Sequence, residues 1–530
     1  MFAAPFWKEA RDERAFAGDL CQSRQGAVKH RGNGEASEST EKGRKMKELP
    51  AGRTRFDCQR AELGHNVRAT TRYYYIIRVK ARTRCFFECT KNRLLSITSM
   101  TRTSLAILVA ALAIAAHGQR AEFVRVEKHI LTRNGRPYRF VGANYWYAPL
   151  LPLEKDPDRG IRRLRRELDS LKANGVINLR LMAGAEGSGL INGVTRVGPP
   201  LQPEQGRFDE RVMRALDRAL YEIGRRGMTA VIFLSNNWEW TGGFQQYLVW
   251  NGREPARFLS DKPTWDEYRD EVAKFYSCEL CVAAYRKQVE TVVSRTNSIT
   301  GRRYQDDRAI MAWELANEPR PMRASANNAY RHWISESAAL IRSLDKNHLI
   351  SIGHEGSIGT EDVKLYEEIN ADPNIDYMTI HIWPKNWGWF TGSDLAASFP
   401  NILDQTAKYI DENAAVAQRL DKPLVIEEFG LPRDQFSFDP KSSTSFRDRY
   451  YAAILSHVAG QPGGNKYIAG ANFWAFGGAV RPIDGQTFWK PGDQFTGDPP
   501  MEEQGLNTVF ESDRSTYSVI RNTAGAIKSR

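Results

Sequence analysis

IMAWELANEPR, residues 310–320, is the stretch that decides the fold of this 530-residue chain. It begins as a short apolar run and ends in a cluster of polar and charged side chains. Amphipathic stretches with helical periodicity lie on both sides of it, at 281–295 and 328–344. A short apolar run between two such stretches is typical of a buried strand in a parallel sheet whose outer face is covered by helices.

The same unit recurs along the chain and predicts an α/β fold. Eight apolar runs lie at 140–143, 177–182, 229–234, 310–315, 349–352, 377–381, 424–427 and 470–474. Further helical patterns lie at 160–174, 209–225, 401–419 and 445–458. Eight strands that alternate with helices fit a (β/α)8 TIM barrel with long βα loops. A doubly wound open sheet is the alternative, but no glycine-rich phosphate-binding motif follows any run.

The segments before the barrel differ from the rest of the chain. Asn134-Gly135 predicts an N-terminal β-hairpin between 123–126 and 138–141. Residues 100–121 have the basic start, the short apolar run and the small-residue cleavage pattern of a secretory signal peptide. Residues 1–99 hold 21 Lys and Arg against 11 Asp and Glu, without sustained periodicity.

Because a signal peptide stands at the start of a protein, we predict that residues 1–99 are a non-native or disordered upstream extension. A basic arm that binds nucleic acid is the alternative. Residues 122–530 then form a single domain of a secreted, extracellular protein. We expect it to be a monomer, with no nucleic-acid or membrane partner.

Two of the six cysteines, Cys278 and Cys281, fall inside the predicted domain with C-x-x-C spacing. A structural zinc site would need a second ligand pair, and a redox motif would need a thioredoxin-like context. Neither is present in the sequence, so one local disulfide and two inert thiols remain as alternatives. No H-E-x-x-H or similar pattern occurs either, and we expect neither a metal nor a cofactor.

Polar and aromatic side chains stand where the predicted strands end. The C-terminal ends of the strands of a barrel meet on one face, so these side chains are expected to share one cleft. In chain order they are Trp146, Arg180, Trp238, Asn317, Glu318, His381, Trp383, Glu428 and Trp474.

Glu318 and Glu428 are the residue types that the hydrolysis of a glycosidic bond requires. One carboxylic acid protonates the leaving oxygen, and one carboxylate attacks the anomeric carbon from about 5 Å away when configuration is retained. Glu427 directly precedes Glu428, and neighbouring residues of a strand point to opposite faces. Only one of the two is therefore expected to enter the site, and spacing alone does not say which.

Three motifs resemble glycoside hydrolase family 5, and within it the endo-β-1,4-mannanases. They are WELANEPR at 313–320, HIWPKNWGW at 381–389 and LVIEEFG at 424–430, and the resemblance covers about 120–525. It implies a retaining hydrolase that cuts internal bonds of mannans, glucomannans or galactomannans by double displacement. In that reaction Glu318 is the acid/base and Glu428 is the nucleophile.

The resemblance also assigns roles to the neighbours of the two carboxylates. Arg180 would keep Glu428 ionised, Asn317 would hold the sugar 2-hydroxyl, and His381 would join the carboxylate network. The anion on Glu428 is expected to raise the pKa of Glu318. Flat apolar faces for sugar rings would come from the four tryptophans Trp146, Trp238, Trp383 and Trp474.

Two departures from the family pattern concern the third and sixth strands. Many members have His-x-Tyr on the sixth strand, whereas this chain has His-x-Trp at 381–383, which offers no phenolic hydroxyl. The third strand ends in Asn236-Asn237 in place of a histidine. A family 5 endo-β-glucanase remains the main alternative function, and a non-catalytic sugar-binding barrel is another.

Overall fold

The computed structural model describes residues 122–252, 262–390, 394–460 and 464–529. The predictions for the upstream extension and the signal peptide lie outside these ranges. In the described part of the chain, no helix combines the length and the apolar composition that crossing a bilayer requires.

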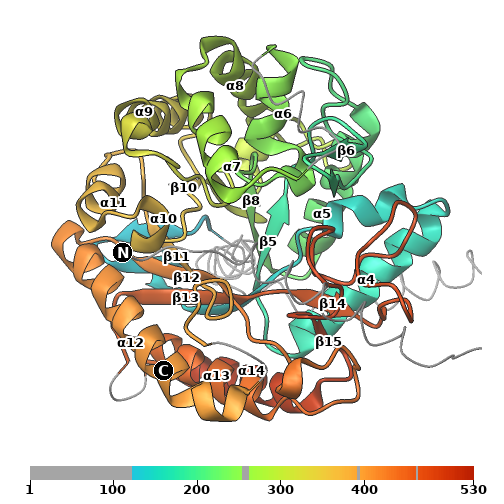
Figure 1. Ribbon diagram of the computed structural model, residues 1–530, viewed down its shortest axis with the longest axis vertical. Helices are drawn as coiled ribbons and strands as arrows, with labels where there is room; N and C mark the ends of the chain where they lie inside the picture. The colour runs from blue at the N-terminus through green and yellow to red at the C-terminus, as the bar shows by residue number, and fades with distance from the viewer. Residues whose placement is uncertain (1–121, 253–261, 391–393, 461–463, 530) are drawn as a thin grey trace, which may run out of the picture. The chain divides into compact units, whose positions relative to one another are not determined.

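Eight parallel strands form the central sheet (Figure 1), and every residue in them is buried. Their order in the sheet is β10-β9-β8-β5-β4-β13-β12-β11. All eight coincide with predicted runs to within two residues. The strands are β4 (Phe140–Asn144), β5 (Asn178–Met182), β8 (Thr229–Phe233), β9 (Ile310–Glu314), β10 (Leu349–Ser351), β11 (Met378–Ile382), β12 (Leu424–Phe429) and β13 (Ile468–Phe473).

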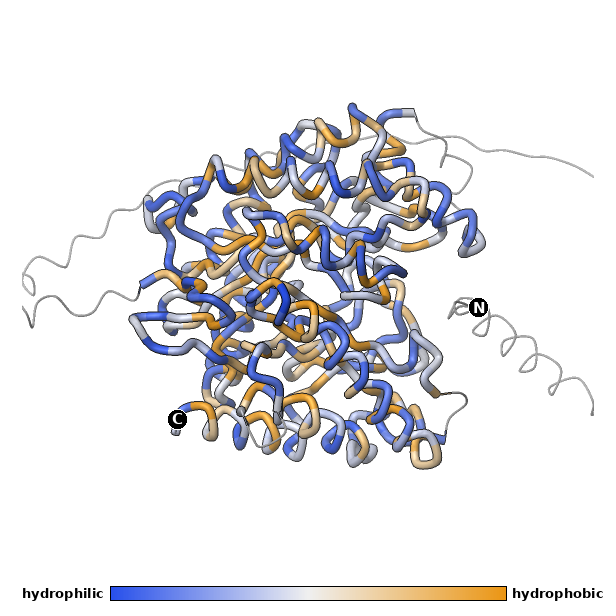
Figure 2. The backbone as a smooth tube through the Cα atoms, turned by 90° about the vertical axis from the view of Figure 1, so that its left-hand side faces the viewer, coloured by the Kyte–Doolittle hydropathy of each residue, from blue (hydrophilic) through white to orange (hydrophobic). Residues whose placement is uncertain are grey.

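Helices surround this sheet, as a (β/α)8 barrel requires (Figure 1). Hydrophobic and hydrophilic residues alternate along them (Figure 2), because each helix turns one apolar face to the strands. The longer helices are α4 (Pro157–Ala173), α5 (Glu210–Arg225), α8 (Glu279–Val293), α9 (Asn327–Leu344), α12 (Leu395–Leu420), α13 (Ser445–Val458) and α14 (Arg514–Lys528). The shorter ones are α6 (Gly243–Trp250), α7 (Trp265–Val272), α10 (Ser357–Thr360) and α11 (Val363–Asn370).

The seam between β10 and β11 is where the ring of strands is least complete. These two strands share no ladder in the described residues, and they end the sheet order on either side. Single hydrogen bonds cross the seam instead: Asp376 N donates to Ile350 O at 2.8 Å, and His381 N donates to Glu355 O at 2.9 Å. On the far side of the barrel, β13 pairs regularly with β4.

The N-terminal hairpin was only partly predicted. The Asn134-Gly135 turn is present, but it joins β2 (Ile130–Arg133) to β3 (Arg136–Pro137), and β1 (Arg125–Glu127) adds a third strand. The predicted second arm at 138–141 is wrong, because Phe140 already pairs with β13 as the start of β4. Apolar residues of this segment pack against buried residues of the barrel strands.

Cys278 and Cys281 form a disulfide at the start of α8. Both residues are buried, and the Cys278 sulfur accepts the backbone N–H of Cys281. Of the two alternatives that the sequence left open, the structure has the local bridge.

Candidate active site

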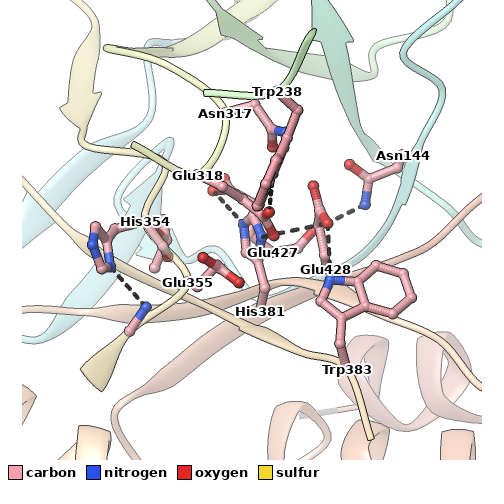
Figure 3. A network of polar contacts seen from close by, with 12 residues as sticks. Asn144, Trp238, Asn317, Glu318, His354, Glu355, His381, Trp383, Glu427 and Glu428 are labelled. Carbon is pink, nitrogen blue, oxygen red and sulfur yellow. Dashed lines mark hydrogen bonds and ion pairs between the residues drawn. The ribbon is translucent and has the colours of Figure 1, made fainter. Parts of the chain in front are cut away.

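Glu318 leaves β9 through a turn that its neighbours fix. Its φ of 51° lies in the left-handed region, which a non-glycine residue adopts only when surrounding structure holds it there. Its backbone N–H donates to Gly353 O at 2.9 Å. A Cβ on Gly353 would lie 2.2 Å from Ala316 O, so only glycine allows this close approach. The turn directs the Glu318 side chain toward His381 (Figure 3).

The structure brings Glu318 and Glu428 together across the end of the barrel. His381 Nδ1 lies 2.6 Å from Glu318 Oε1 and 3.3 Å from Glu428 Oε2, between the two carboxyl groups (Figure 3). The contacting atoms of the three side chains lie within 4.8 Å of one another. Two carboxyl groups this close fit a retaining glycosidase, in which the separation is about 5 Å, and not an inverting one.

The same three side chains are the one group of His, Cys, Asp or Glu residues in the described ranges close enough to hold a metal ion. Each is already engaged: Glu318 by Trp238, Glu428 by Arg180 and Trp383, and His381 by both carboxylates. The chemistry of a carboxylate pair needs no metal.

Arg180, at the centre of the barrel, has all five N–H groups engaged by side chains. Its Nε donates to both oxygens of Glu314, at 3.0 and 3.1 Å, and Nη2 donates to Glu314 and to Asn317 at 2.9 and 2.8 Å. Nη1 donates to Asn144 at 3.2 Å and to Glu428. As predicted, the guanidinium stands beside Glu428, but it has no N–H left for a sugar.

Glu427 departs from the prediction that neighbouring residues of β12 face opposite sides. Its Oε2 lies 3.7 Å from Arg180 Nε and 3.9 Å from His381 Nε2, so it joins the same buried group as Glu428. The cause is an irregularity of register between β11 and β12: Ile380 pairs with Ile426, whereas His381 pairs with Glu428. One residue is skipped, and the strict alternation of the strand is lost.

On the other side of the cleft, Trp238 and Arg320 surround Glu318. Trp238 Nε1 donates to Glu318 Oε2 at 2.5 Å, and the Arg320 guanidinium lies 5.3 Å from the Trp238 ring centroid. Arg320 forms a bidentate ion pair with Glu355, with Nη2 to Oε1 at 2.6 Å. Arg320 is thus held beside the Trp238 ring by an ion pair.

Burial is the main cause of the shifted pKa values in this cleft. It raises the pKa of Glu318, which Arg320, the hydrogen bond from Trp238 and Arg180 lower again. Burial also raises the pKa of Glu428 well above its usual value, and Arg180 opposes that shift. The direction for Glu318 is the predicted one, but the sequence named the neighbouring anion as the cause. Burial and then Arg180 lower the pKa of His381 well below its usual value, so its imidazole is neutral.

The tryptophans divide into residues of the cleft and one residue of the core. Trp383 Nε1 donates to Glu428 Oε2 at 3.2 Å. The indole N–H thus supplies a hydrogen-bond donor in place of the tyrosine hydroxyl. Trp474 packs edge-on against Trp383, with ring centroids 6.0 Å apart. Trp146 was wrongly predicted as a sugar platform: it is fully buried, its Nε1 donates to Gly497 O, and it packs against Trp240.

Asn317 holds its position through hydrogen bonds at both ends of its amide. Its Oδ1 accepts from Arg180, and its Nδ2 donates to Asn236 Oδ1 at 3.0 Å. The second N–H of Nδ2 remains for a ligand. Asn236, which replaces the histidine of many relatives on this strand, thus orients Asn317.

Several residues of this network were not assigned a role from the sequence. Asn144 and Glu314 end β4 and β9, and His354 and Glu355 follow β10. This strand-end position was the only signal in the sequence that could have identified them, and the arginine partners of Glu314 and Glu355 are known only from the structure. Burial, Arg320 and His381 lower the pKa of His354 to about 3, and its Nδ1 accepts the Gly356 N–H at 2.9 Å.

A family model described as GH family 5 beta-mannosidase-like matches residues 121–530. The chain belongs to glycoside hydrolase family 5. Mannan endo-1,4-beta-mannosidase 1 of Oryza sativa subsp. japonica is 30% identical over 398 residues, which cover 70% of this chain and 84% of that protein. Mannan endo-1,4-beta-mannosidase 7 of Arabidopsis thaliana is 30% identical over 366 residues, covering 66% and 77%.

Solved structures of family 5 agree with this assignment. The Glycoside Hydrolase Family 5 Mannosidase from Rhizomucor miehei is 30% identical, with a TM-score of 0.68, and the match covers 77% of this chain and 98% of that one. A glutamate-to-alanine variant of the same enzyme, in complex with mannosyl-fructose, gives a TM-score of 0.69 at the same identity. The chain is thus a mannanase-type glycoside hydrolase built on a TIM barrel, and its substrate is a polysaccharide.

Proposed function

We propose that this family 5 enzyme is a secreted, extracellular endo-β-1,4-mannanase that hydrolyses internal bonds of mannans with retention of configuration. Glu318 serves as the acid/base and Glu428 as the nucleophile. The observation that carries the proposal is the meeting of the two carboxyl groups at one imidazole nitrogen, with oxygens within 4.8 Å. That separation leaves no room for a water between carboxylate and sugar, so the carboxylate itself attacks.

The hydrogen-bond donors support Glu428 as the nucleophile. Glu428 accepts N–H groups from Arg180 and Trp383, and one of these donors carries a full positive charge. Glu318 accepts a neutral indole N–H from Trp238, and its Oε1 lies 2.6 Å from Nδ1 of the neutral His381 imidazole, so neither contact is cationic. Because hydrogen bonds from cationic donors favour the ionised form, the negative charge resides on Glu428 and the proton on Glu318.

The reaction then proceeds in two balanced steps. Glu428 forms a bond to the anomeric carbon while the glycosidic C–O bond breaks and the Glu318 proton moves to the leaving oxygen. The ester has no charge, so the pKa of Glu318 falls and the group becomes a base. It takes a proton from water, whose oxygen attacks the anomeric carbon and releases Glu428 as a carboxylate.

The activities named for the relatives and the aromatic side chains of the site support mannan as the substrate. The rice and Arabidopsis relatives are mannan endo-1,4-beta-mannosidases. Trp474 and Trp383 border the carboxylate pair, where a sugar ring would pack on them. Asn317 directly precedes Glu318, and the second N–H of its Nδ2, which has no partner among the described residues, would donate to the sugar 2-hydroxyl.

Azide rescue of two alanine variants tests the roles. We expect Glu428→Ala and Glu318→Ala each to lower kcat on an activated β-mannoside by roughly 10⁴-fold. Azide should then yield the α-mannosyl azide with Glu428→Ala, where it attacks the substrate directly, and the β-mannosyl azide with Glu318→Ala, where it attacks the glycosyl-enzyme. Wild-type turnover by either variant, or exchanged products, would overturn the assignment.

Product analysis tests the substrate and the position of cleavage. Purified mannan should give a mixture of oligosaccharides with an early fall in viscosity, and carboxymethyl-cellulose should give little reducing sugar. Release of mannose alone would contradict the endo mode, and activity confined to cellulose would favour the glucanase alternative. Mass spectrometry of the mature protein in the medium would test secretion.

A further inference from the structure

Beneath the nucleophile lies a second carboxyl pair, Glu427 and Glu314, for which the proposed mechanism has no use. Both side chains are fully buried, and they contact each other as well as Arg180. Two carboxylates in contact inside a protein repel strongly unless a proton lies between them. The question is whether the pair holds one, and on which residue.

Counting donors answers it. The five N–H groups of Arg180 go to Glu314, Asn317, Asn144 and Glu428, and none is left for Glu427. Glu427 Oε2 is 3.7 Å from Arg180 Nε, beyond hydrogen-bond distance, and has no hydrogen-bond partner among the described residues. Glu314, by contrast, accepts three contacts from the guanidinium.

Counting charge leads to the same residue. Three carboxyl groups, of Glu314, Glu427 and Glu428, surround the single charge of Arg180. His381 Nε2 lies 3.9 Å from Glu427 but belongs to a neutral imidazole. Two tyrosines that also face Glu427 are neutral, since burial by itself raises their pKa values; they are Tyr366 and Tyr377.

We propose that Glu427 is a positioning residue that stays a neutral carboxylic acid in the working enzyme, with its O–H donated to Glu314. The protonation of Glu427 does not depend on the proposed function, and only its effect on catalysis rests on that function. Glu314, held by Glu427 and by three guanidinium contacts, fixes the orientation of Arg180, which keeps Nη1 directed at Glu428. Ionisation of Glu427 would add a third anion beside Arg180, in competition with Glu314 and Glu428 for the same guanidinium.

Burial, followed by the charge of Glu314, raises the pKa of Glu427 well above its usual value, in agreement with this assignment. The sign of its effect on stability follows. A carboxyl group whose pKa is raised in the folded state contributes stability that is complete below its unfolded pKa, about 4.3. That contribution is lost as pH rises toward the folded value.

Glu427→Gln tests the proposal, because glutamine keeps a neutral donor for Glu314 and cannot titrate. Infrared spectra of the full chain at neutral pH should lose one protonated-carboxyl band in Glu427→Gln relative to wild type. The band that belongs to Glu318 should remain, and Glu318→Gln identifies it. A spectrum unchanged by Glu427→Gln would overturn the proposal.

Thermal melting between pH 4.5 and 8 gives a second readout. Tm should fall less steeply with pH in Glu427→Gln than in wild type, and at neutral pH the variant should be at least as stable. Glu222→Gln is the matched control: Glu222 is equally buried, but it is ionised and accepts hydrogen bonds from Arg165 and Arg226. That variant should melt earlier at neutral pH, and the same early melting in Glu427→Gln would contradict a neutral Glu427.

Measurements of kcat/KM distinguish a positioning role of Glu427 from a role in packing alone. We expect Glu427→Ala to lower kcat/KM about tenfold or more, and Glu427→Gln to recover most of that loss. Equal losses in both variants would refute the proposal. Neither the infrared nor the melting experiment uses a polysaccharide, so their outcome is independent of the azide test of the catalytic roles.

Discussion

The Glu428 side and the Glu318 side of the site, which we propose to be the nucleophile side and the acid/base side, use the same residue types in different ways. Each side has a buried glutamate, a second glutamate, an arginine and an indole N–H. On the nucleophile side, Arg180 donates directly to Glu428. On the acid/base side, Arg320 donates two hydrogen bonds to Glu355, and in the described structure it makes none to Glu318.

With the proposed roles, this difference explains how one barrel makes an anion and an acid from identical side chains. Direct donation from a guanidinium favours an ionised carboxylate, whereas a guanidinium paired elsewhere acts only through space. The Arg320 charge still lowers the pKa of Glu318, but less than burial raises it. The following substitutions test the contrast, from the largest expected effect to the smallest.

Arg180→Lys should cause the largest loss. A lysine ammonium has three donors and cannot serve four acceptor side chains, so Glu314 and Glu428 would lose part of their pairing. We expect kcat/KM to fall by about 10²- to 10³-fold, with the acid limb of its pH profile moved to higher pH because the pKa of Glu428 rises. A loss below tenfold with an unmoved acid limb would show that direct donation is not what keeps Glu428 ionised.

Arg320→Gln should move the basic limb of the pH profile of kcat/KM. Without this cation the pKa of Glu318 rises further, so the acid stays protonated to higher pH and the basic limb of kcat/KM moves up. We expect about a tenfold loss at the optimum, since Glu355 also loses its partner. In the double variant Arg320→Gln/Glu355→Gln the buried anion is gone, and part of the shift should return; additive losses would argue against coupling.

Trp383→Phe removes one N–H from the nucleophile side. Its hydrogen bond is to Glu428, so the pKa of Glu428 should rise and the acid limb should move to higher pH by less than about one unit. We expect about a tenfold fall in kcat/KM, measured on a soluble mannooligosaccharide. A shift confined to the basic limb would assign this indole to Glu318 instead.

Trp238→Phe is the matched deletion on the acid/base side and should have the smallest effect. The indole N–H lowers the pKa of Glu318, so its removal should extend the basic limb to higher pH, with kcat/KM reduced about threefold. The two tryptophan variants should therefore move opposite limbs of the same profile. If both moved the same limb, the distinction between the two sides would be lost.

The barrel itself could be predicted from the sequence because its strands are short, apolar and separated by amphipathic helices. The prediction failed where local pattern and tertiary pairing disagree. Residues 138–141 look like a hairpin arm, but Phe140 pairs with Gly470 of β13, near the other end of the barrel sequence. No local signal marks such a partner.

The candidate site could be predicted at the level of strand ends, and less well at the level of individual roles. The position of a residue on a strand end placed Glu318, Glu428, Arg180, Asn317 and His381 in one cleft. It could not reveal the register irregularity that brings Glu427 inward, because irregular pairing depends on two strands at once. Strand-end position also could not distinguish Trp146, which packs in the core, from Trp383, which lies in the site.

The seam between β10 and β11 bears on how this enzyme would lose activity on heating. The seam lies beside Glu318 and Glu428, with Glu355 on the β10 side and His381 on the β11 side, joined by the His381 N–H to Glu355 O hydrogen bond. Isolated hydrogen bonds open more readily than a continuous ladder, so amide exchange is expected to be fastest along this line within the sheet. Local separation of β10 and β11 would move the His381 imidazole away from Glu318 while the rest of the barrel stays intact. We therefore expect inactivation to precede unfolding.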